Sequence, residues 1–237
     1  LEAHHEIDPA AAVGGDGLPA LLCGMVGSDL GWREIGHRPL PVAAEDLGPA
    51  CVEVAPGVRI VPGVKRPDGT DLMRGEEVKA FGAALGEARL TLLTPGTHPK
   101  LIRMQDGRVV DVRTALTGEL YALLTRHSTL RRGDQSWSDA VFDEGVAVGR
   151  ARGTYGLFET RARVVSGAAS PEHAHAFLSG LLIGAELAAR ESEPDVLVGD
   201  PDICRLYARA LDRPDVPRVD GDAAVIAGLT RLMEHAS

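Results

Sequence analysis

A short turn rich in hydrogen-bond donors separates two apolar runs at Pro95-Gly96-Thr97-His98-Pro99-Lys100. Glycine lets an anionic group approach the backbone closely, and the amides after Gly96 can donate to phosphate oxygens together with the Thr97 hydroxyl. His98 and Lys100 could add positive charge beside the same group. These residue types predict a turn that holds the β- or γ-phosphate of a nucleotide. An ordinary hairpin turn with an exposed lysine beside it is the alternative.

A second group of reactive side chains lies between residues 71 and 77, where Asp71, Arg74, Glu76 and Glu77 stand at the head of an expected helix over 75–85. The guanidinium of Arg74 could hold a substrate carboxylate through two hydrogen bonds. A surface ion pair explains Arg74 equally well. The acids could accept protons, or they could simply favour the positive end of the helix dipole.

The hydrophobic pattern predicts the elements that must position these residues. From residue 89 onward it indicates three strands, a helix, a mostly helical stretch, a strand, a helix, a short strand and a last helix. Asp106-Gly107 predicts a tight turn between the second and third strands. The predicted strands cover 89–94, 100–104, 108–114, 195–198 and 217–219, and the predicted helices cover 117–126, 138–150, 170–190, 202–211 and 220–234.

The earlier part of the chain has a less regular pattern. Residues 1–17 have few periodic apolar positions and are expected to form a poorly specified leader. Residues 20–26 are expected to be a buried strand, which ends in a flexible turn at Gly24. Proline and glycine dominate residues 36–71, with two short strands expected at 51–54 and 58–61.

Size and composition limit the kinds of protein this can be. The chain has 237 residues, of which 44% are apolar and 25% charged, as in ordinary globular proteins. The net charge of −9 argues against nucleic-acid binding, which needs a basic footprint. Its three widely spaced cysteines argue against a disulfide framework or a structural zinc site and suit a reducing cytoplasm. No apolar run is long enough to predict a membrane span.

Six sequence blocks resemble those of the 2-keto-3-deoxygalactonate kinases (2-dehydro-3-deoxygalactonokinases). The blocks keep the family's order and together cover about residues 20–235. Each block alone is a weak signal, and their combination is fairly specific. They are LLCGMVGS with GW at 21–32, VPG at 61–63, DLMRGEE at 71–77, PGTHPK at 95–100, LTGEL with HS at 116–128, and LSGLLIGAE at 178–186.

The resemblance implies an α/β fold with the ribonuclease H-like, two-lobe architecture of actin, Hsp70 chaperones and sugar kinases. The predicted element order from residue 89 agrees with one such lobe. Residues 1–72 would be the remainder of an N-terminal sugar-binding lobe, incomplete in this sequence. Residues 73–237 would be the nucleotide-binding lobe, with a helical insertion at about 136–190. A homodimer is a further, open expectation.

The resemblance also implies an activity: ATP-dependent phosphorylation of the 6-hydroxyl of 2-keto-3-deoxygalactonate, with Mg²⁺, in cytoplasmic galactonate or galactose catabolism. In related kinases the base is a carboxylate at the start of a helix just before the second phosphate turn. Glu76 stands at that place, with Glu77 and Asp71 as competitors on the same segment. Arg74 would contact the substrate carboxylate.

The remaining expected contacts divide between sugar acid and nucleotide, and each has a simpler explanation. Gly24, Ser28 and Trp32 are expected to face the sugar acid, although packing alone explains Trp32 equally well. Thr117 and Glu119 would line the site or merely begin a helix. Gly199 would let adenine or ribose approach, or would form a plain strand-to-helix turn.

The sequence departs from the family pattern in two places. The family's N-terminal Asp-x-Gly-Ser/Thr-Thr-Asn-x-Arg turn, which contacts phosphate and magnesium in related kinases, does not occur in it. Metal ligands are therefore unknown. Pro99 also stands where the family has serine.

Two alternatives to this kinase stay open, and a third, from another enzyme class, is discounted. A regulatory nucleotide-binding protein of the same fold would tolerate the absent turn, and a kinase for a gluconate-series acid differs only in reading one hydroxyl. An aldolase or hydrolase would need a reactive lysine or a nucleophile–base pair, and only Lys65, Lys79 and Lys100 are present. His173 and His175 are poorly spaced for metal, and Glu186 within an apolar helix is unexplained.

Overall fold

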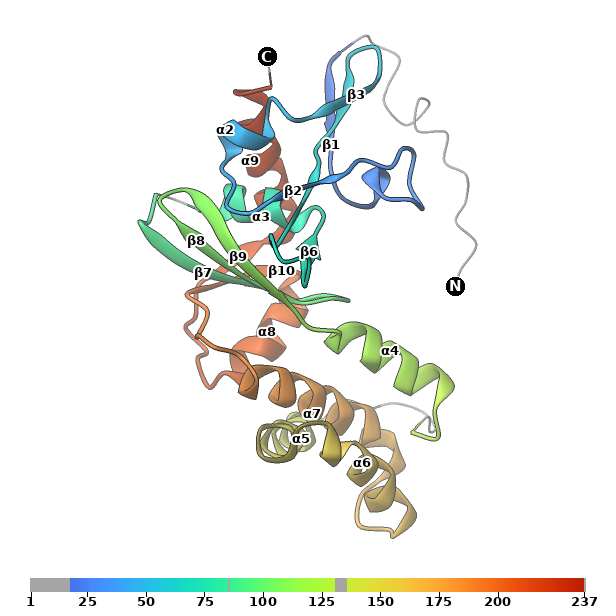
Figure 1. Cartoon of the computed structure of the whole chain (residues 1–237). Helices are drawn as coiled ribbons and strands as arrows, with labels where there is room; N and C mark the ends of the chain where they lie inside the picture. Colours follow the sequence, from blue (N-terminus) through green and yellow to red (C-terminus); the bar gives the residue numbers. More distant parts are fainter. Residues whose placement is uncertain (1–17, 85, 131–135, 237) are drawn as a thin grey trace. The chain divides into compact units, whose positions relative to one another are not determined.

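The computed structural model describes residues 18–84, 86–130 and 136–236, so the expected leader over residues 1–17 lies outside the described residues. The described chain is mixed α/β, and its strands form three sheets (Figure 1). No helix in these segments is long and apolar enough to cross a membrane. The strands are β1 (Ala20–Leu22), β2 (His37–Pro39), β3 (Val52–Ala55), β4 (Val58–Ile60), β5 (Gly63–Lys65), β6 (Leu72–Met73), β7 (Arg89–Thr94), β8 (Lys100–Gln105), β9 (Arg108–Thr114), β10 (Val196–Gly199) and β11 (Arg218–Asp220).

All of the predicted helices occur in the structure. Asp200 and Asp220 cap α8 and α9, since each side chain accepts from two backbone amides of the first turn. The helices are η1 (Gly24–Gly27), α2 (Ala44–Leu47), α3 (Glu76–Ala83), α4 (Thr117–His127), α5 (Asp139–Arg152), η2 (Gly153–Gly156), α6 (Leu157–Val165), η3 (Pro171–His173), α7 (Ala174–Ala188), α8 (Pro201–Ala210) and α9 (Gly221–Met233).

The largest sheet has the strand order β11-β10-β7-β8-β9. The predicted meander of β7, β8 and β9 is confirmed to within a residue at each end. Asp106 and Gly107 have φ values of 48° and 75°, which is the pair of positive values that a two-residue type I′ hairpin turn requires. The 95–99 turn connects β7 to β8 in this sheet.

Two three-stranded sheets are built from the first third of the chain. In one, β4 pairs parallel with β1 and antiparallel with β3. In the other, β5 pairs parallel with β2 and antiparallel with β6. The strands expected at 51–54 and 58–61 are thus confirmed as β3 and β4.

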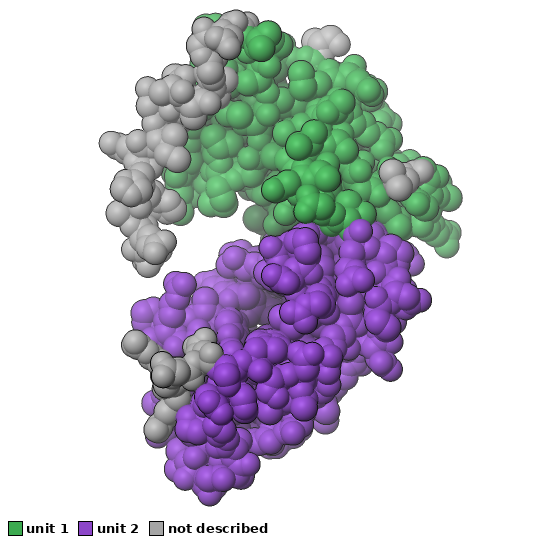
Figure 2. Space-filling model, turned by 180° about the vertical axis from the view of Figure 1, so that it is seen from behind, with its two compact units in different colours: residues 1–92, 102–113, 219–237 green, residues 93–101, 114–218 purple. Residues whose placement is uncertain are grey.

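The chain divides into two compact units that interleave along the sequence (Figure 2). Unit 1 contains Leu1–Leu92, Ile102–Arg113 and Val219–Ser237, and unit 2 contains Leu93–Leu101 and Thr114–Arg218. The sequence-based lobes, 1–72 and 73–237, stay a prediction.

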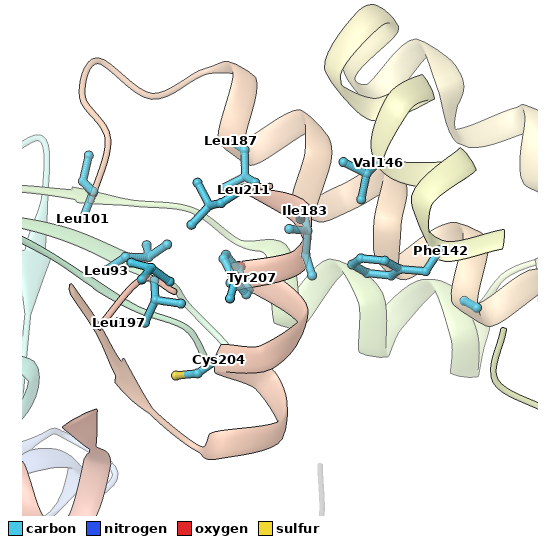
Figure 3. Close-up of a cluster of buried hydrophobic side chains, with 14 residues drawn as sticks. Leu93, Leu101, Phe142, Val146, Ile183, Leu187, Leu197, Cys204, Tyr207 and Leu211 are labelled. Atoms are coloured by element: carbon cyan, nitrogen blue, oxygen red, sulfur yellow. The ribbon is translucent and has the colours of Figure 1, made fainter. Parts of the chain in front are cut away.

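Unit 2 has a hydrophobic core between strand residues and helices α5, α7 and α8. Leu93 and Leu197 lie on the strand side of this cluster, and Tyr207 and Ile183 lie on the helix side (Figure 3). Tyr207 is 2% exposed, so its phenol ring is a full member of the core. The core fixes α7 and α8 against the strands that lead into the 95–99 turn.

Glycines allow α5 and α7 to pack with their backbones in contact. A Cβ atom on Gly180 would lie 2.0 Å from the Phe142 carbonyl oxygen, and one on Gly149 would lie 2.0 Å from that of Leu181. Gly145 and Gly184 meet the facing helix in the same way. Close packing of the two helices therefore explains the glycines of α7.

Unit 1 uses the same device between α3 and α9. A Cβ atom on Gly82 would lie 1.9 Å from the Ala224 carbonyl oxygen, and one on Gly228 would lie 2.0 Å from that of Val78. Val78 and Phe81 of α3 are buried. The position of α3, and of the acidic block at its head, thus depends on a helix about 140 residues later in the chain.

The structure differs from the sequence prediction at several element ends. The strand expected over 20–26 ends at Leu22, because Gly24 has a φ of 82° and begins a 3₁₀ turn. The helix expected over 170–190 begins with η3 at Pro171, and the Ser170 side chain makes no capping hydrogen bond. The expected helix over 75–85 ends at Ala83, and Leu85 lies outside the described residues.

Candidate active site

The 95–99 turn of unit 2 offers open space to a ligand at Gly96. A Cβ atom on Gly96 would meet nothing within 4 Å, and Thr97 and His98 are exposed. Lys100 is only 5% exposed, and its ammonium group donates to the His98 carbonyl oxygen at 3.0 Å. The buried lysine side chain therefore stabilises the backbone of the turn through this hydrogen bond.

The first turn of α4 packs directly on the 95–99 turn. A Cβ atom on Gly118 would lie 2.3 Å from the Gly96 carbonyl oxygen and 2.7 Å from the Thr97 Cα atom. The Glu119 amide donates to the Thr97 carbonyl oxygen at 2.9 Å. Glu119 also pairs through its carboxylate with His98, at 2.6 Å. The backbone of α4 is thus packed on, and hydrogen-bonded to, the backbone of the 95–99 turn.

Gly199 lies against the same turn from the end of β10. It is buried, and a Cβ atom there would lie 3.4 Å from the Pro95 carbonyl oxygen. That distance is an ordinary van der Waals contact. The predicted nucleotide residues, from Gly96 to Lys100 and Gly199, are therefore neighbours in unit 2.

A cavity of about 220 Å³ opens beside Gly96 in unit 2. Three of the nine aromatic side chains of this aromatic-poor protein contribute to its wall. Stacking of a planar group on such side chains is a common source of binding energy. The lining residues are Gly96, Thr117, Gly118, Tyr121, Trp137, Ser179, Leu182, Ile183, Ile203, Leu206 and Tyr207.

Two residues of the cavity wall bind a buried carboxylate that sequence reasoning did not connect with them. Oε2 of Glu186 accepts hydrogen bonds from the Thr117 and Tyr207 hydroxyls, both at 2.6 Å. Burial raises the pKa of Glu186, and burial together with the Glu186 charge raises the pKa of Tyr207 well above its usual value. The one available sequence signal was a glutamate within an otherwise apolar helix.

The acidic block of unit 1 forms a turn before α3 that requires glycine. Gly75 has a φ of 104°, and a Cβ atom there would lie 3.1 Å from the Gly24 Cα atom. Only glycine takes this conformation without strain and allows the loop after β1 to come so close. The structure thus brings the predicted Gly24 turn and the predicted 71–77 block together.

Arg74 is directed into unit 1 and away from bulk solvent. Its Nη2 atom donates to the Ile35 carbonyl oxygen at 2.5 Å, and lies 3.3 Å from Nε2 of His37. A Cβ atom on Gly27 would lie 2.9 Å from Nη1 of Arg74. That Nη1 atom is buried and has no hydrogen-bond partner among the described residues. This nitrogen therefore has hydrogen-bond donors that no described residue uses.

Glu76 and Glu77 have different environments despite their adjacency. Glu77 is fully buried, and both of its carboxylate oxygens lie 2.8 Å from the Gly75 amide, which donates to them. Burial is the largest cause that raises the pKa of Glu77 to about 8. Glu76 is half-buried and accepts from the Arg74 amide at 3.2 Å. Of the two, Glu76 is the one with solvent access.

The other predicted sugar-side residues lie in two loops. Ser28 and Trp32 lie in the loop after β1, and Asp71 lies just before β6. The Ser28 hydroxyl donates to the Met25 carbonyl oxygen at 2.8 Å, and the Trp32 amide donates to that of Val26 at 2.9 Å. Asp71 accepts from the Leu72 amide at 2.8 Å. Trp32 and Asp71 are half-buried.

The predicted site residues thus fall into two groups, one in each unit. Unit 1 holds Gly24, Ser28, Trp32, Asp71, Arg74, Glu76 and Glu77, and unit 2 holds Gly96, Thr97, His98, Lys100, Thr117, Glu119 and Gly199. Within residues 18–84, 86–130 and 136–236, no three His, Cys, Asp or Glu side chains are arranged to hold a metal ion.

Comparison with known proteins gives one consistent result. Residues 3–232 match the family described as 2-keto-3-deoxy-galactonokinase. The chain is 35% identical to the 2-dehydro-3-deoxygalactonokinase of Escherichia coli (strain K12), over 92% of this chain and 79% of that protein. It is 36% identical to a Rhizobium meliloti (strain 1021) protein described provisionally as the 2-dehydro-3-deoxygalactonokinase DgoK1, over 90% of this chain and 77% of that one.

A solved structure agrees with these sequence matches. It is the crystal structure of a Sinorhizobium meliloti protein, described provisionally as a 2-dehydro-3-deoxygalactonokinase. The two structures superpose with a TM-score of 0.84 at 34% sequence identity, over 94% of this chain and 82% of that chain.

Proposed function

The chain belongs to the 2-keto-3-deoxy-galactonokinase family, and we propose that it transfers a phosphoryl group from ATP to the 6-hydroxyl of 2-dehydro-3-deoxy-D-galactonate. The product is the 6-phosphate, an intermediate of galactonate or galactose catabolism. The observation that carries this proposal is the family match over nearly the whole chain. The geometry of the two residue groups supports it. We place the reaction in the cytoplasm.

The fold supports a ribonuclease H-like nucleotide lobe within residues 73–237. The order β9-β8-β7-β10-β11 places a three-strand meander beside two later strands, each of which is followed by a helix. That is the arrangement shared by actin, Hsp70 chaperones and sugar kinases. We assign residues 1–72 to the sugar-binding lobe and 136–190 to a helical insertion.

The residues of unit 2 fit a nucleotide. The open position at Gly96 lets a phosphate approach the amides of the 95–99 turn, where Thr97 and His98 add donors. The adjoining cavity is smaller than the roughly 300 Å³ at which sites for drug-sized ligands begin, so it would take the base and leave ribose and phosphates outside. ATP, when bound, supplies the phosphoryl group, and Mg²⁺ neutralises its charge. We assign the ion no protein ligand.

The residues of unit 1 fit the sugar acid. Glu76, with its solvent access, would accept the proton of the attacking hydroxyl. Arg74 would donate to the substrate carboxylate through Nη1, which has no hydrogen-bond partner among the described residues. Glu77 would act as a positioning residue, because its carboxylate holds the Gly75 amide and has no exposure. Gly24, Ser28, Trp32 and Asp71 would complete the substrate surface.

The test is ADP release from MgATP with 2-dehydro-3-deoxygalactonate, measured for the wild type and for Glu76→Gln. Loss of a general base should lower kcat by about 10²- to 10⁴-fold. Survival of turnover in that variant would move the base to Asp71 or Glu77, which Asp71→Asn and Glu77→Gln would separate. No turnover by a wild type that still binds ATP would refute the kinase assignment. Equal turnover of the gluconate-series acid would refute the stereochemical one.

A further inference from the structure

Three helices of unit 2 meet at a single oxygen atom. Thr117 is the first residue of α4, Glu186 lies in the last turn of α7, and Tyr207 lies in α8. Both hydroxyls donate to Oε2 of Glu186 at 2.6 Å. Hydrogen bonds this short are typical of an ionised acceptor and are stronger than those between neutral groups. Glu186 therefore ties α4 and α8 to α7.

The two hydroxyl residues also form part of the cavity wall. Thr117 and Tyr207 line the cavity beside Gly96, whereas Glu186 does not. Thr117 is adjacent to Gly118, which packs on the 95–99 turn with no room for a Cβ atom. A shift of Thr117 would thus move both the cavity wall and the turn expected to hold phosphate.

A buried positive charge accompanies this carboxylate. Arg190 follows Glu186 by four residues, and its Nε, Nη1 and Nη2 atoms are buried with no hydrogen-bond partner among the described residues. Burial has the largest effect on the pKa of Glu186 and raises it, whereas the two hydroxyl donors and then the Arg190 charge lower it. The guanidinium therefore acts as a countercharge without a hydrogen bond to the carboxylate.

We infer that Glu186 is a positioning residue for the nucleotide: its carboxylate fixes Thr117 and Tyr207 so that the cavity and the 95–99 turn keep the geometry that binds base and phosphate. This inference rests on the proposed function, because it takes the cavity to be the nucleotide site. It also explains why an apolar helix carries a glutamate at this position. Glu186 itself touches neither substrate.

The experiment measures ADP affinity by calorimetry for the wild type, Glu186→Gln, Tyr207→Phe and the double variant. Glu234→Gln is the matched control, since Glu234 is exposed at the end of α9. We expect Glu186→Gln to weaken ADP binding about tenfold, with a smaller loss for Tyr207→Phe. The double variant should lose less than the sum of the two free-energy changes, because both variants remove the same hydrogen bond.

Steady-state kinetics separate positioning from general damage. Glu186→Gln should raise the KM for ATP about tenfold and leave the KM for the sugar acid within about twofold of the wild type. A rise in both KM values together with a lower melting temperature would overturn the inference in favour of a purely structural role. Unchanged ADP affinity in both single variants would also overturn it. A wild type that binds ADP without phosphorylating the sugar acid would refute the proposed function alone, and the ADP comparison would still decide the role of Glu186.

Discussion

Replacing Gly118 with alanine should damage phosphoryl transfer far more than stability. The added Cβ atom would lie 2.3 Å from the Gly96 carbonyl oxygen and 2.7 Å from the Thr97 Cα atom, whereas ordinary contacts begin near 3.4 Å. One side must therefore yield by about 1 Å. The turn is the softer side, because Thr97 and His98 are exposed. Alanine also favours the helix by up to about 1 kcal/mol over glycine, which offsets part of the cost of the clash.

The kinetic cost follows from the size of that displacement. A misplacement of about 1 Å in the groups that position a reacting centre can cost about 10²-fold in rate, or about 2.7 kcal/mol of transition-state stabilisation. The assay is kcat/KM for ATP from ADP release, with a thermal melt of the same sample. Gly36→Ala is the control, since a Cβ atom there would meet nothing within 4 Å. A Gly118→Ala enzyme with wild-type kcat/KM would refute the reasoning that the 95–99 turn positions phosphate.

Two further predictions concern stability. Burial raises the pKa of Glu77 from 4.5 to about 8, so the folded state holds this proton more tightly than the unfolded chain. The contribution of Glu77 to the free energy of unfolding should therefore be greatest below about pH 4.5 and decline, by at most about 1.4 kcal/mol per pH unit, as the pH rises through about 8. Glu77→Gln should flatten melting temperature against pH in this window, and an unchanged slope would contradict the assignment. Gly180→Ala should lower the melting temperature by several degrees, because its Cβ atom would lie 2.0 Å from the Phe142 carbonyl oxygen. For a chain of this size each kcal/mol of lost stability lowers the melting temperature by about 2–4 °C. A melting temperature equal to that of Gly36→Ala would contradict the close helix packing.

The sequence was sufficient to predict the elements with strong local signals. The β7–β8–β9 meander follows from three apolar runs and from Asp106-Gly107, whose type I′ turn is a strictly local property. The helices over 117–126 and 202–211 follow from the period of their apolar residues. For the same reason the sequence predicts the 95–99 turn between two strands.

Elements without such signals could not be predicted. Strands β2, β5 and β6 have two or three residues each in a segment rich in proline and glycine, and pairing with distant strands is what defines them. Helix α6 has a single buried residue, Thr160, so it has no apolar stripe to detect. Tertiary contacts fix these elements, and a single sequence does not contain those contacts explicitly.

The chemistry of the site depends even more strongly on long-range contacts. The sequence identified Thr117 as a candidate but could not connect it to Glu186 and Tyr207, which are 69 and 90 residues away. It also could not distinguish Glu76 from Glu77, because adjacent residues of one type have the same local signal. The two residues differ in burial: the Glu77 side chain is fully buried in the first turn of α3, whereas the Glu76 side chain is half-buried.

The glycine contact between α3 and α9 has a consequence for the order in which the newly made chain can fold. Gly82 and Gly228 bring the two helices together, and α9 begins only after every residue of unit 2 has been synthesised. Unit 2 can therefore fold on the ribosome while α3 still lacks its partner. Val78 and Phe81 remain uncovered on that face until α9 emerges. Nascent chains stalled before residue 221 should be captured by chaperones through the uncovered face of α3.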